Sequence, residues 1–252
     1  MKIVVIGGTG LIGSHAVRLL LDHGHEAVAA SPNSGVNTLT GEGVDAALAG
    51  ADVVVDVSNS PSFADDAVMD FFTTSTKTLI AAARKAGVRH YVALSVVGTE
   101  RMTDSGYMRA KEAQERLIRE SGIPFSLVHA TQFFEFVKSI ADAATDGDTV
   151  RLAPVVIKPI AAADVAAAVA RTAAGSPVGG VLEVSGPEEF RLTELIARGL
   201  AARGDARQIV GDPEARYFGA RLSDRELVPG PGAEVFPTTF AQWLDEQVAT
   251  TR

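Results

Sequence analysis

A glycine-rich turn near the start of the chain, Gly7-Gly8-Thr9-Gly10-Leu11-Ile12-Gly13, constrains the fold more than any other feature. It follows a short apolar run at residues 2–6, whose β-branched residues are typical of a buried strand. Residues 14–23 then carry apolar side chains at helical spacing. Glycines between a strand and a helix allow a tight turn and admit a pyrophosphate against bare backbone at the helix N-terminus. The pattern predicts a dinucleotide site; the alternative is a glycine-rich turn that binds nothing.

Strand-like and helix-like segments alternate along the first half of the chain. Strands are expected at 26–30, 51–57, 90–95 and 123–129, and long helices at 66–86 and 107–121. This alternation predicts an α/β fold with a Rossmann-type, doubly wound parallel sheet. Residues 36–40 also resemble a strand, but only five residues separate Ala30 from Val36. Because a parallel crossover needs about a dozen residues, we expect an irregular sheet edge there.

The second half of the chain is less regular. Prolines interrupt the apolar residues of 148–160, and a Pro- and Gly-rich stretch precedes a final helix expected at about 239–248. No linker of the kind that separates domains is present. We therefore predict a single domain over 1–252, in which about 131–160 and 186–252 form a small irregular C-terminal subdomain that binds the substrate.

Composition excludes several classes of protein. The 252 residues, 46% of them hydrophobic, are enough to bury the core of one α/β domain. Cysteine is absent, which rules out a disulfide framework and fits a reducing cytosol. The net charge of −8 disfavours nonspecific nucleic-acid binding. No apolar run approaches the roughly 20 residues of a membrane helix, no signal peptide precedes the first strand, and the five histidines lack metal-ligand spacing. We expect a cytoplasmic protein without metal, membrane or nucleic-acid partners, either monomeric or homodimeric.

The residues after the second expected strand bear on cofactor choice. An acidic side chain there usually bonds the ribose 2′-OH of NAD, and an arginine suits the 2′-phosphate of NADP. This chain has neither: Ser31, Asn33 and Ser34 are neutral donors that bond a phosphate without repelling it. The sequence favours NADP(H) over NAD(H), unless these residues only build a turn, for which they are equally well suited.

Tyr107 and Lys111 are candidates for acid–base chemistry. They are four residues apart, so on a helix they share one face. A nearby ammonium favours the phenolate, and Tyr107 would then exchange a proton with a carbonyl or alcohol while a cofactor exchanges hydride. Ser95 ends the preceding strand and would polarise the substrate oxygen. The alternative is an ordinary helix with a half-buried aromatic residue and a solvated lysine.

Residues after the 123–129 strand are candidates for the substrate pocket. His129, Gln132 and Phe133 fall at the end of a strand where open α/β sheets bind ligands. A buried structural histidine and simple helix packing explain the same residues equally well. Ser58, Ser95 and His129 do not indicate a hydrolase, because the chain has no Gly-x-Ser-x-Gly elbow.

Together these motifs resemble the atypical short-chain dehydrogenase/reductase superfamily, in its NmrA-like NAD(P)-binding branch. The resemblance spans nearly the whole chain and is carried by the glycine turn, 82–88 leading into 90–95, 107–111, 120–125, 162–166 and 183–187. It implies cofactor contacts at Gly7, Thr9, Gly10, Leu11, Ile12, Gly13, Ser31 and Ser58, and Lys111 on the nicotinamide ribose. Many relatives carry an arginine where this chain has Ser31.

The resemblance implies one of two functions. The first is an NAD(P)H-dependent oxidoreductase of short-chain dehydrogenase/reductase type, acting on a small apolar carbonyl, quinone or enone with Tyr107, Lys111 and Ser95. The second is a non-catalytic NAD(P)-binding redox sensor, since many relatives lack the tyrosine. Retention of all three side chains favours the enzyme.

Overall fold

A computed structural model describes residues 1–250 and is built on one seven-stranded sheet. Its strands run in the order β12-β9-β5-β4-β3-β1-β2, and every neighbouring pair is parallel. The strands are β1 (Lys2–Ile6), β2 (Glu26–Ala30), β3 (Val53–Asp56), β4 (His90–Val96), β5 (Phe125–Ala130), β9 (Val181–Ser185) and β12 (Glu234–Val235). The predicted α/β, Rossmann-type doubly wound parallel sheet is confirmed.

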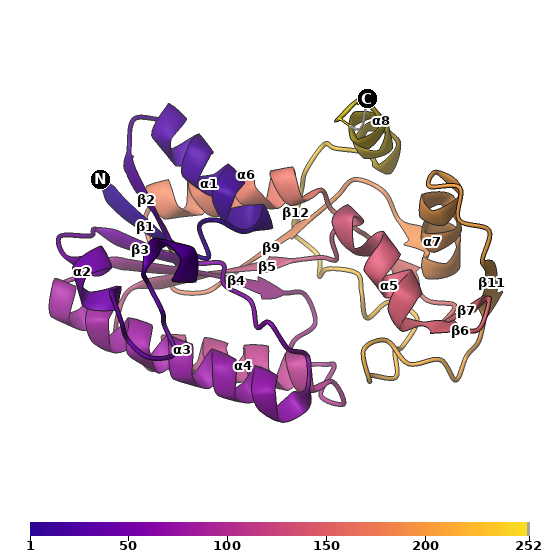
Figure 1. Ribbon diagram of the computed structural model, residues 1–252, viewed down its shortest axis with the longest axis horizontal. Coiled ribbons are helices and arrows are strands. Elements are labelled where there is room, and N and C mark those ends of the chain that lie inside the picture. The colour runs from indigo at the N-terminus through magenta and orange to yellow at the C-terminus, as the bar shows by residue number, and fades with distance from the viewer. Residues whose placement is uncertain (251–252) are drawn as a thin grey trace.

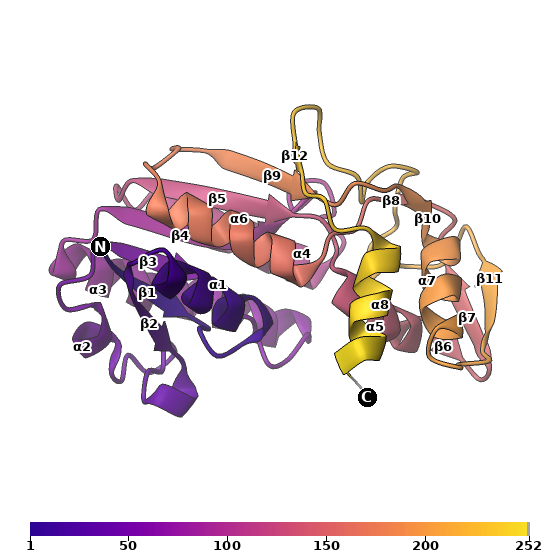
Figure 2. The ribbon, with the colours of Figure 1, turned by 90° about the horizontal axis from the view of Figure 1, so that it is seen from above.

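Helices cover both faces of this sheet (Figure 1). On one face lie α1 (Leu11–Asp22) and α6 (Ala162–Ala174), which are seen side by side in Figure 2. On the other lie α3 (Asp65–Ala86), α4 (Gly106–Arg119) and the short α2 (Val44–Leu48). Alternate residues of β1 face the two layers: Ile3 and Val5 pack toward α1 and α6, Val4 and Ile6 toward α2 and α3. Burial on both faces explains why this strand is apolar throughout.

The sheet edge at β2 is irregular, as the short connection predicts. After β2 the chain makes a single 3-10 turn, η1 (Pro32–Ser34), and residues 36–40 form turns rather than a strand. The Asn37 side chain accepts the backbone N–H groups of Leu39 and Thr40, at 2.9 and 3.3 Å. This local bonding replaces a strand ladder.

The remaining elements gather beyond the ends of β4 and β5 (Figures 1 and 2). They are η2 (Phe134–Phe136), α5 (Val137–Ala143), β6 (Thr145–Asp146), β7 (Thr149–Leu152), β8 (Val156–Ile157), β10 (Phe190–Arg191), α7 (Leu192–Ala201), β11 (Gln208–Gly211) and α8 (Phe240–Thr250). They share an apolar cluster that includes Phe134, Ile157, Leu192 and Trp243, separate from the two clusters under the main sheet. Residues from both segments, 131–160 and 186–250, thus line one apolar cluster, although β12 belongs to the main sheet. The division into a single domain with a substrate-binding subdomain stays a prediction. No helix of residues 1–250 is both long and apolar enough to cross a membrane.

Candidate cofactor and active site

Backbone packing explains the glycines of the turn between β1 and α1. Gly7 has a φ of +78°, and a Cβ there would approach the Ser58 nitrogen at 2.9 Å. A Cβ on Gly8 would lie 2.7 Å from the Ala29 Cα, and one on Gly13 would overlap the Gly7 carbonyl oxygen. The turn, α1, β2 and the loop after β3 thus meet at distances that only glycine permits.

The N-terminus of α1 is open to an anion. Its N-cap is Gly10, no side chain caps it, and its first turn holds no acidic residue. Thr9, Gly10 and Leu11 are exposed, whereas Ile12 and Gly13 are buried against the sheet. The first N–H groups of a helix have no partners within the helix and carry partial positive charge. This end of α1 suits the pyrophosphate of a dinucleotide.

The polar residues at the end of β2 divide into two kinds. Ser34 is used by the turn itself: its Oγ accepts the Ser31 backbone N–H at 2.9 Å and donates to the Ser31 carbonyl at 3.0 Å. The buried Ser31 hydroxyl faces the Ser34 backbone N–H in a capping box but makes no hydrogen bond with it, and Asn33 is exposed. An unpaired buried hydroxyl and an exposed amide beside the adenosine side of a Rossmann sheet fit a ribose or its phosphate.

A buried carboxylate, Asp56, ends β3 and is 1% exposed. Its Oδ1 accepts the Ser58 backbone N–H at 3.1 Å and the Ser58 hydroxyl at 2.6 Å. Its Oδ2 accepts the Gln114 Nε2 at 3.0 Å and the Tyr91 hydroxyl at 3.3 Å. Burial and the Asp56 charge raise the pKa of Tyr91 well above its usual value, so Tyr91 acts here as a donor.

Lys111, on α4, adjoins this network through Gln114 and is 2% exposed. Its Nζ donates to the Leu94 carbonyl at 2.8 Å and to the Gln114 Oε1, and it sits 4.4 Å from the centre of the Phe72 ring. Burial lowers the pKa of Lys111 to about 8, although the charges of Asp56 and Glu115 act in the opposite direction. Lys111 is thus a buried cation with a shifted pKa, which is typical of functional lysines.

Tyr107 lies in the first turn of α4 and is half-buried. Its hydroxyl donates to the Asn59 Oδ1 at 3.3 Å, and its ring contacts Phe63 and Phe72 at centroid distances of 5.6 and 5.9 Å. Burial raises the pKa of Tyr107 to about 12. The lowering expected from Lys111 is not found here: burial alone shifts the pKa of Tyr107, and the Lys111 ammonium is hydrogen-bonded to Gln114 and Leu94.

Ser95 faces a different partner from the one predicted. Its hydroxyl is buried and donates to the Glu115 Oε1 at 2.5 Å. The same oxygen lies 2.9 Å from the His129 Nε2, at an angle poor for a hydrogen bond, and Arg119 donates to Glu115 Oε2 at 3.0 Å. Burial by itself would raise the pKa of Glu115, but the contacts with His129, Ser95 and Arg119 outweigh it and lower that pKa to about 2. Ser95 and His129 are therefore brought together by Glu115, without contacting Tyr107.

The predicted pocket residues after β5 include an unpaired amide. Gln132 is 7% exposed, and neither its Oε1 nor its Nε2 has a hydrogen-bond partner. Phe133 stacks on Phe136 at a centroid distance of 5.3 Å, and Phe136 is 43% exposed. An unpaired amide and an open aromatic pair after a strand of a parallel sheet suit a ligand with polar and apolar parts.

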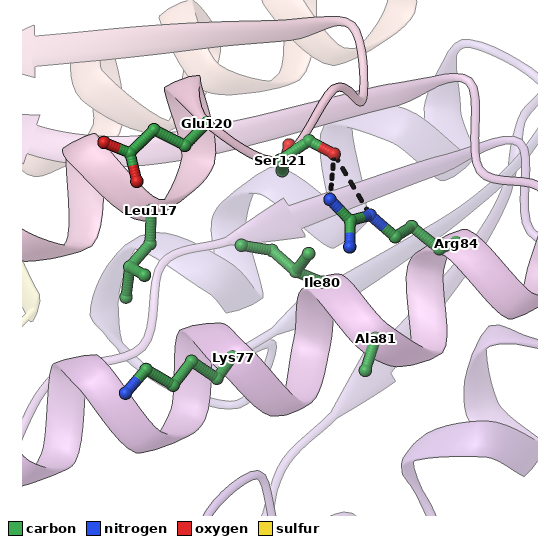
Figure 3. Close-up of a pocket in the computed structure, with 7 residues that line it drawn as sticks. All are labelled: Lys77, Ile80, Ala81, Arg84, Leu117, Glu120 and Ser121. Atoms are coloured by element: carbon green, nitrogen blue, oxygen red, sulfur yellow. Dashed lines mark hydrogen bonds between the residues drawn. The ribbon is translucent and has the colours of Figure 1, made fainter.

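Two hollows lie outside the glycine turn. One, of about 290 Å³, lies between α3 and α4; Figure 3 shows the Arg84 guanidinium there against the Ser121 carbonyl, at 3.0 and 2.5 Å. Arg84 lies near the C-terminal end of α3, and Ser121 lies just after α4. Both helices run antiparallel to the strands, so this hollow lies at the amino ends of the strands, whereas the glycine turn lies at their carboxyl ends. The other, of about 510 Å³, is lined by residues that include Glu115, His129 and Glu183. Within 1–250 no group of three His, Asp or Glu side chains is placed to hold a metal ion.

Comparison with known proteins identifies the family. The family described as "NAD(P)H-binding" matches residues 7–175, from the glycine turn to the end of α6. The chain belongs to this NAD(P)H-binding family. The predicted NAD(P)-binding family is confirmed, and placement in the NmrA-like branch of the atypical short-chain dehydrogenase/reductase superfamily stays a prediction.

Its relatives include a reductase. A (4-alkanoyl-5-oxo-2,5-dihydrofuran-3-yl)methyl phosphate reductase from Streptomyces griseus subsp. griseus is 30% identical over 256 positions, covering 93% of this chain and 84% of the relative. The fold is similar to that of MoeE5 in complex with UDP-glucose and NAD (TM-score 0.75, 17% identity, 100% of both chains). It is also similar to the Escherichia coli quinone oxidoreductase QOR2 complexed with NADPH (TM-score 0.70, 20% identity, 98% and 99%). The chain is thus a member of an NAD(P)H-binding reductase family.

Sequence reasoning missed the partners of its own candidates. Asp56, Gln114 and Glu115 hold Ser58, Lys111 and Ser95, yet none was predicted. One signal was available, because Asp56 is a charged residue inside the apolar run Val53-Val54-Val55-Asp56-Val57 at the carboxyl end of a strand. Gln114 and Glu115 lie three and four residues after Lys111, so on a helix they share the face of Lys111.

Proposed function

We propose that the protein is an NAD(P)H-dependent reductase of a small apolar enone, quinone or carbonyl compound. The observation that carries the proposal is the glycine turn in a family member whose 30%-identical relative is itself a reductase. That relative's name describes an oxo-dihydrofuran, in which a ring double bond is conjugated with a carbonyl. The exposed aromatic side chains Phe63 and Phe136 offer apolar surface for such a compound.

The residues of the turn and the neighbouring strand ends would hold the cofactor. The pyrophosphate would lie at the open N-terminus of α1, and Ser58 would line the same side. NAD(P)H, when bound, supplies the hydride. We propose a preference for NADPH, supported by the unpaired Ser31 hydroxyl, the exposed Asn33 amide and the lack of an acidic side chain after β2.

Tyr107 would supply the proton that balances the hydride. A hydroxyl whose pKa is raised to about 12 by burial is protonated at neutral pH. It therefore holds a proton that it would give to the oxygen of a substrate that gains negative charge, although the raised pKa makes it a weaker acid than a free tyrosine. Lys111 would bind the nicotinamide ribose, as the family resemblance implies. Because the Ser95 hydroxyl donates to Glu115, we assign Ser95 the task of holding that carboxylate.

The experiment is a titration followed by a turnover assay. Fluorescence of Trp243, the single tryptophan of the chain, and of the nicotinamide would report binding of NADPH and NADH. A panel of quinones and enones would then be reduced with the preferred cofactor, by wild-type protein and by Tyr107→Phe. We expect turnover to fall about 10²- to 10⁴-fold in Tyr107→Phe while cofactor affinity stays the same. Full turnover in that variant would show that Tyr107 is not the proton donor. If the protein bound neither cofactor, the proposed function would be wrong.

One observation favours a second function, a non-catalytic NAD(P)-binding redox sensor. The hydroxyl of Tyr107 and the ammonium of Lys111 are each bonded to other protein groups, as they would be in a structural role. A sensor would bind cofactor tightly, reduce no compound of the panel, and change its affinity for a protein partner between NADPH and NADP⁺. Turnover that depends on Tyr107 would exclude it.

A further inference from the structure

Asp56 is a buried charge that no step of the proposed reduction uses. It ends the apolar strand β3, and its side chain is almost fully enclosed. Burying a carboxylate costs several kcal/mol unless donors satisfy both of its oxygens. Here the two oxygens serve different parts of the site, which suggests that the charge has a task beyond stability.

One oxygen of Asp56 fixes the loop beside the glycine turn. The Oδ1 accepts both the backbone N–H and the hydroxyl of Ser58. The Ser58 nitrogen in turn lies where a Cβ on Gly7 would be only 2.9 Å away. Asp56 therefore determines where the Ser58 backbone lies against the turn that would receive the pyrophosphate.

The other oxygen sets the orientation of Gln114 on α4. Asp56 only accepts hydrogen bonds and Lys111 only donates them, so a glutamine between them satisfies both in a single orientation. Its Nε2 must face Asp56, at 3.0 Å, and its Oε1 must face the Lys111 ammonium. A continuous chain of polar contacts thus runs from Ser58 through Asp56 and Gln114 to Lys111.

We propose that Asp56 is a positioning residue that ties the cofactor-side loop at Ser58 to Lys111, through the fixed amide orientation of Gln114. This inference rests on the proposed function, because it takes Ser58 and Lys111 as cofactor-binding residues. One carboxylate would thus fix the positions of two residues on different elements: Ser58 in the loop after β3 and Lys111 on helix α4.

The charges around Lys111 make this assignment measurable. Burial lowers the pKa of Lys111 to about 8, and the carboxylates of Asp56 and Glu115 act against that shift. The other groups that face this network are the Tyr91 hydroxyl on Asp56, the Phe72 ring on Lys111, and His129 and Arg119 on Glu115. Without the Asp56 charge, less opposes the lowering of the Lys111 pKa by burial. The ammonium of Lys111 should therefore lose its proton at lower pH.

The test is an NMR titration of cofactor-free protein with isotope-labelled lysine. The chain has six lysines, and the Lys111 signal is assigned by its loss in Lys111→Arg. In Asp56→Asn we expect Lys111 to titrate below the wild-type pKa. The matched control is Asp52→Asn, whose carboxylate lies before β3 and binds Lys2 and Arg89, and there Lys111 should titrate as in wild type. An unchanged Lys111 titration in Asp56→Asn would overturn the proposal.

Two further variants keep the test decisive if Asp56→Asn folds poorly. Gln114→Leu keeps the charges of Asp56 and Lys111 but removes the carbonyl that Lys111 contacts, so the pKa of Lys111 should fall there too. An unchanged pKa would count against the link from Asp56 through Gln114 to Lys111. In the double variant Asp56→Asn/Gln114→Glu, the carboxylate introduced at position 114 accepts from the amide introduced at position 56 and from Lys111. It should return the Lys111 titration to wild-type pH or above, because a carboxylate then contacts Lys111 directly, and a Lys111 titration that stays below wild type would overturn the assignment.

The loop half of the proposal is tested by cofactor binding. We expect the Kd for NADPH to rise about tenfold in Asp56→Asn, because a charged hydrogen bond that places Ser58 is lost, and to stay unchanged in Asp52→Asn. Equal affinity in Asp56→Asn and wild type would contradict the coupling. If wild-type protein binds neither NADPH nor NADH, the proposed function is wrong, whereas the Lys111 titration still decides whether Asp56 positions Lys111.

Discussion

The glycine turn and helix α4 hold their functional groups in opposite ways. In the turn between β1 and α1 the groups are backbone N–H groups at the start of a helix that no side chain caps. On α4 and β4 the groups are side chains, each already bonded to another protein group: Tyr107 to Asn59, Lys111 to Gln114, and Ser95 to Glu115.

The difference has a physical consequence. A backbone site carries no titratable group, so its binding of an anion does not depend on a protonation state, and it fails when an added side chain fills it. A site of buried side chains depends on paired charges, so it fails when one partner is removed or protonated. The two regions should therefore respond to different perturbations: the turn to added volume, and α4 to lost charge or to pH.

The largest effect is expected from added volume in the turn. In Gly13→Ala the new methyl group would overlap the Gly7 carbonyl oxygen, so the turn must open. We expect the Kd for NADPH to rise on the order of a thousandfold, measured by fluorescence titration. The control is Gly180→Ala, where a Cβ meets no atom within 4 Å. Wild-type affinity in Gly13→Ala would mean that the turn does not bind the cofactor.

The next effect concerns a lost charge at α4. Glu115→Ala would leave Ser95, His129 and Arg119 without their common partner. We expect the free energy of unfolding to fall by about 3 kcal/mol, measured by urea denaturation. Glu112→Ala, an exposed carboxylate one turn earlier on the same helix, should change it by less than about 0.5 kcal/mol. Equal effects in both variants would show that the Glu115 contacts contribute nothing.

A related prediction uses pH to remove the same charge. Contacts in the folded protein lower the pKa of Glu115 from the ordinary 4.5 to about 2. An acid with a lowered pKa stabilises the folded state above its unfolded pKa, and this contribution is lost as pH falls from about 4.5 through 2. The unfolding free energy of wild type should therefore decline more steeply below pH 5 than that of Glu115→Gln. Parallel pH curves for the two proteins would contradict this.

The smallest effect is expected where a side chain adjoins the backbone site. Asn33 is exposed after β2, and Asn33→Asp places a negative charge where we propose the 2′-phosphate of NADPH. Repulsion should raise the Kd for NADPH about tenfold, whereas the Kd for NADH, the internal control, should stay the same. Equal changes for both cofactors would mean that residues 31–34 only form a turn.

The same contrast explains what the sequence predicted well. The fold and the glycine turn depend on neighbours in the chain: β1, the turn and α1 occupy residues 2–22 without a break. The parallel sheet follows from alternating segments, and the irregular edge from a connection too short for a crossover. These features depend only on the spacing of residues that are near one another in the chain, so they can be predicted from the sequence.

The side-chain network was harder to predict because its partners are distant in the chain. Ser95 and Glu115 are 20 residues apart, and Asp56 and Gln114 are 58 apart. The spacing of Tyr107 and Lys111 places them on one helical face, but it does not say which acceptor each polar end reaches. Those acceptors, Asn59 and Gln114, come from tertiary packing.

The route of the chain between its apolar clusters bears on how this protein can evolve and be engineered. The chain leaves the main sheet after β5, returns at α6, leaves again after β9 and returns once more at β12. Neither part is a contiguous segment, so no single cut separates them, and a foreign substrate-side module cannot be grafted with one junction. New specificity must arise by substitution in place. Rotation of one part against the other must bend several connections together, which favours small shearing motions over a wide hinge.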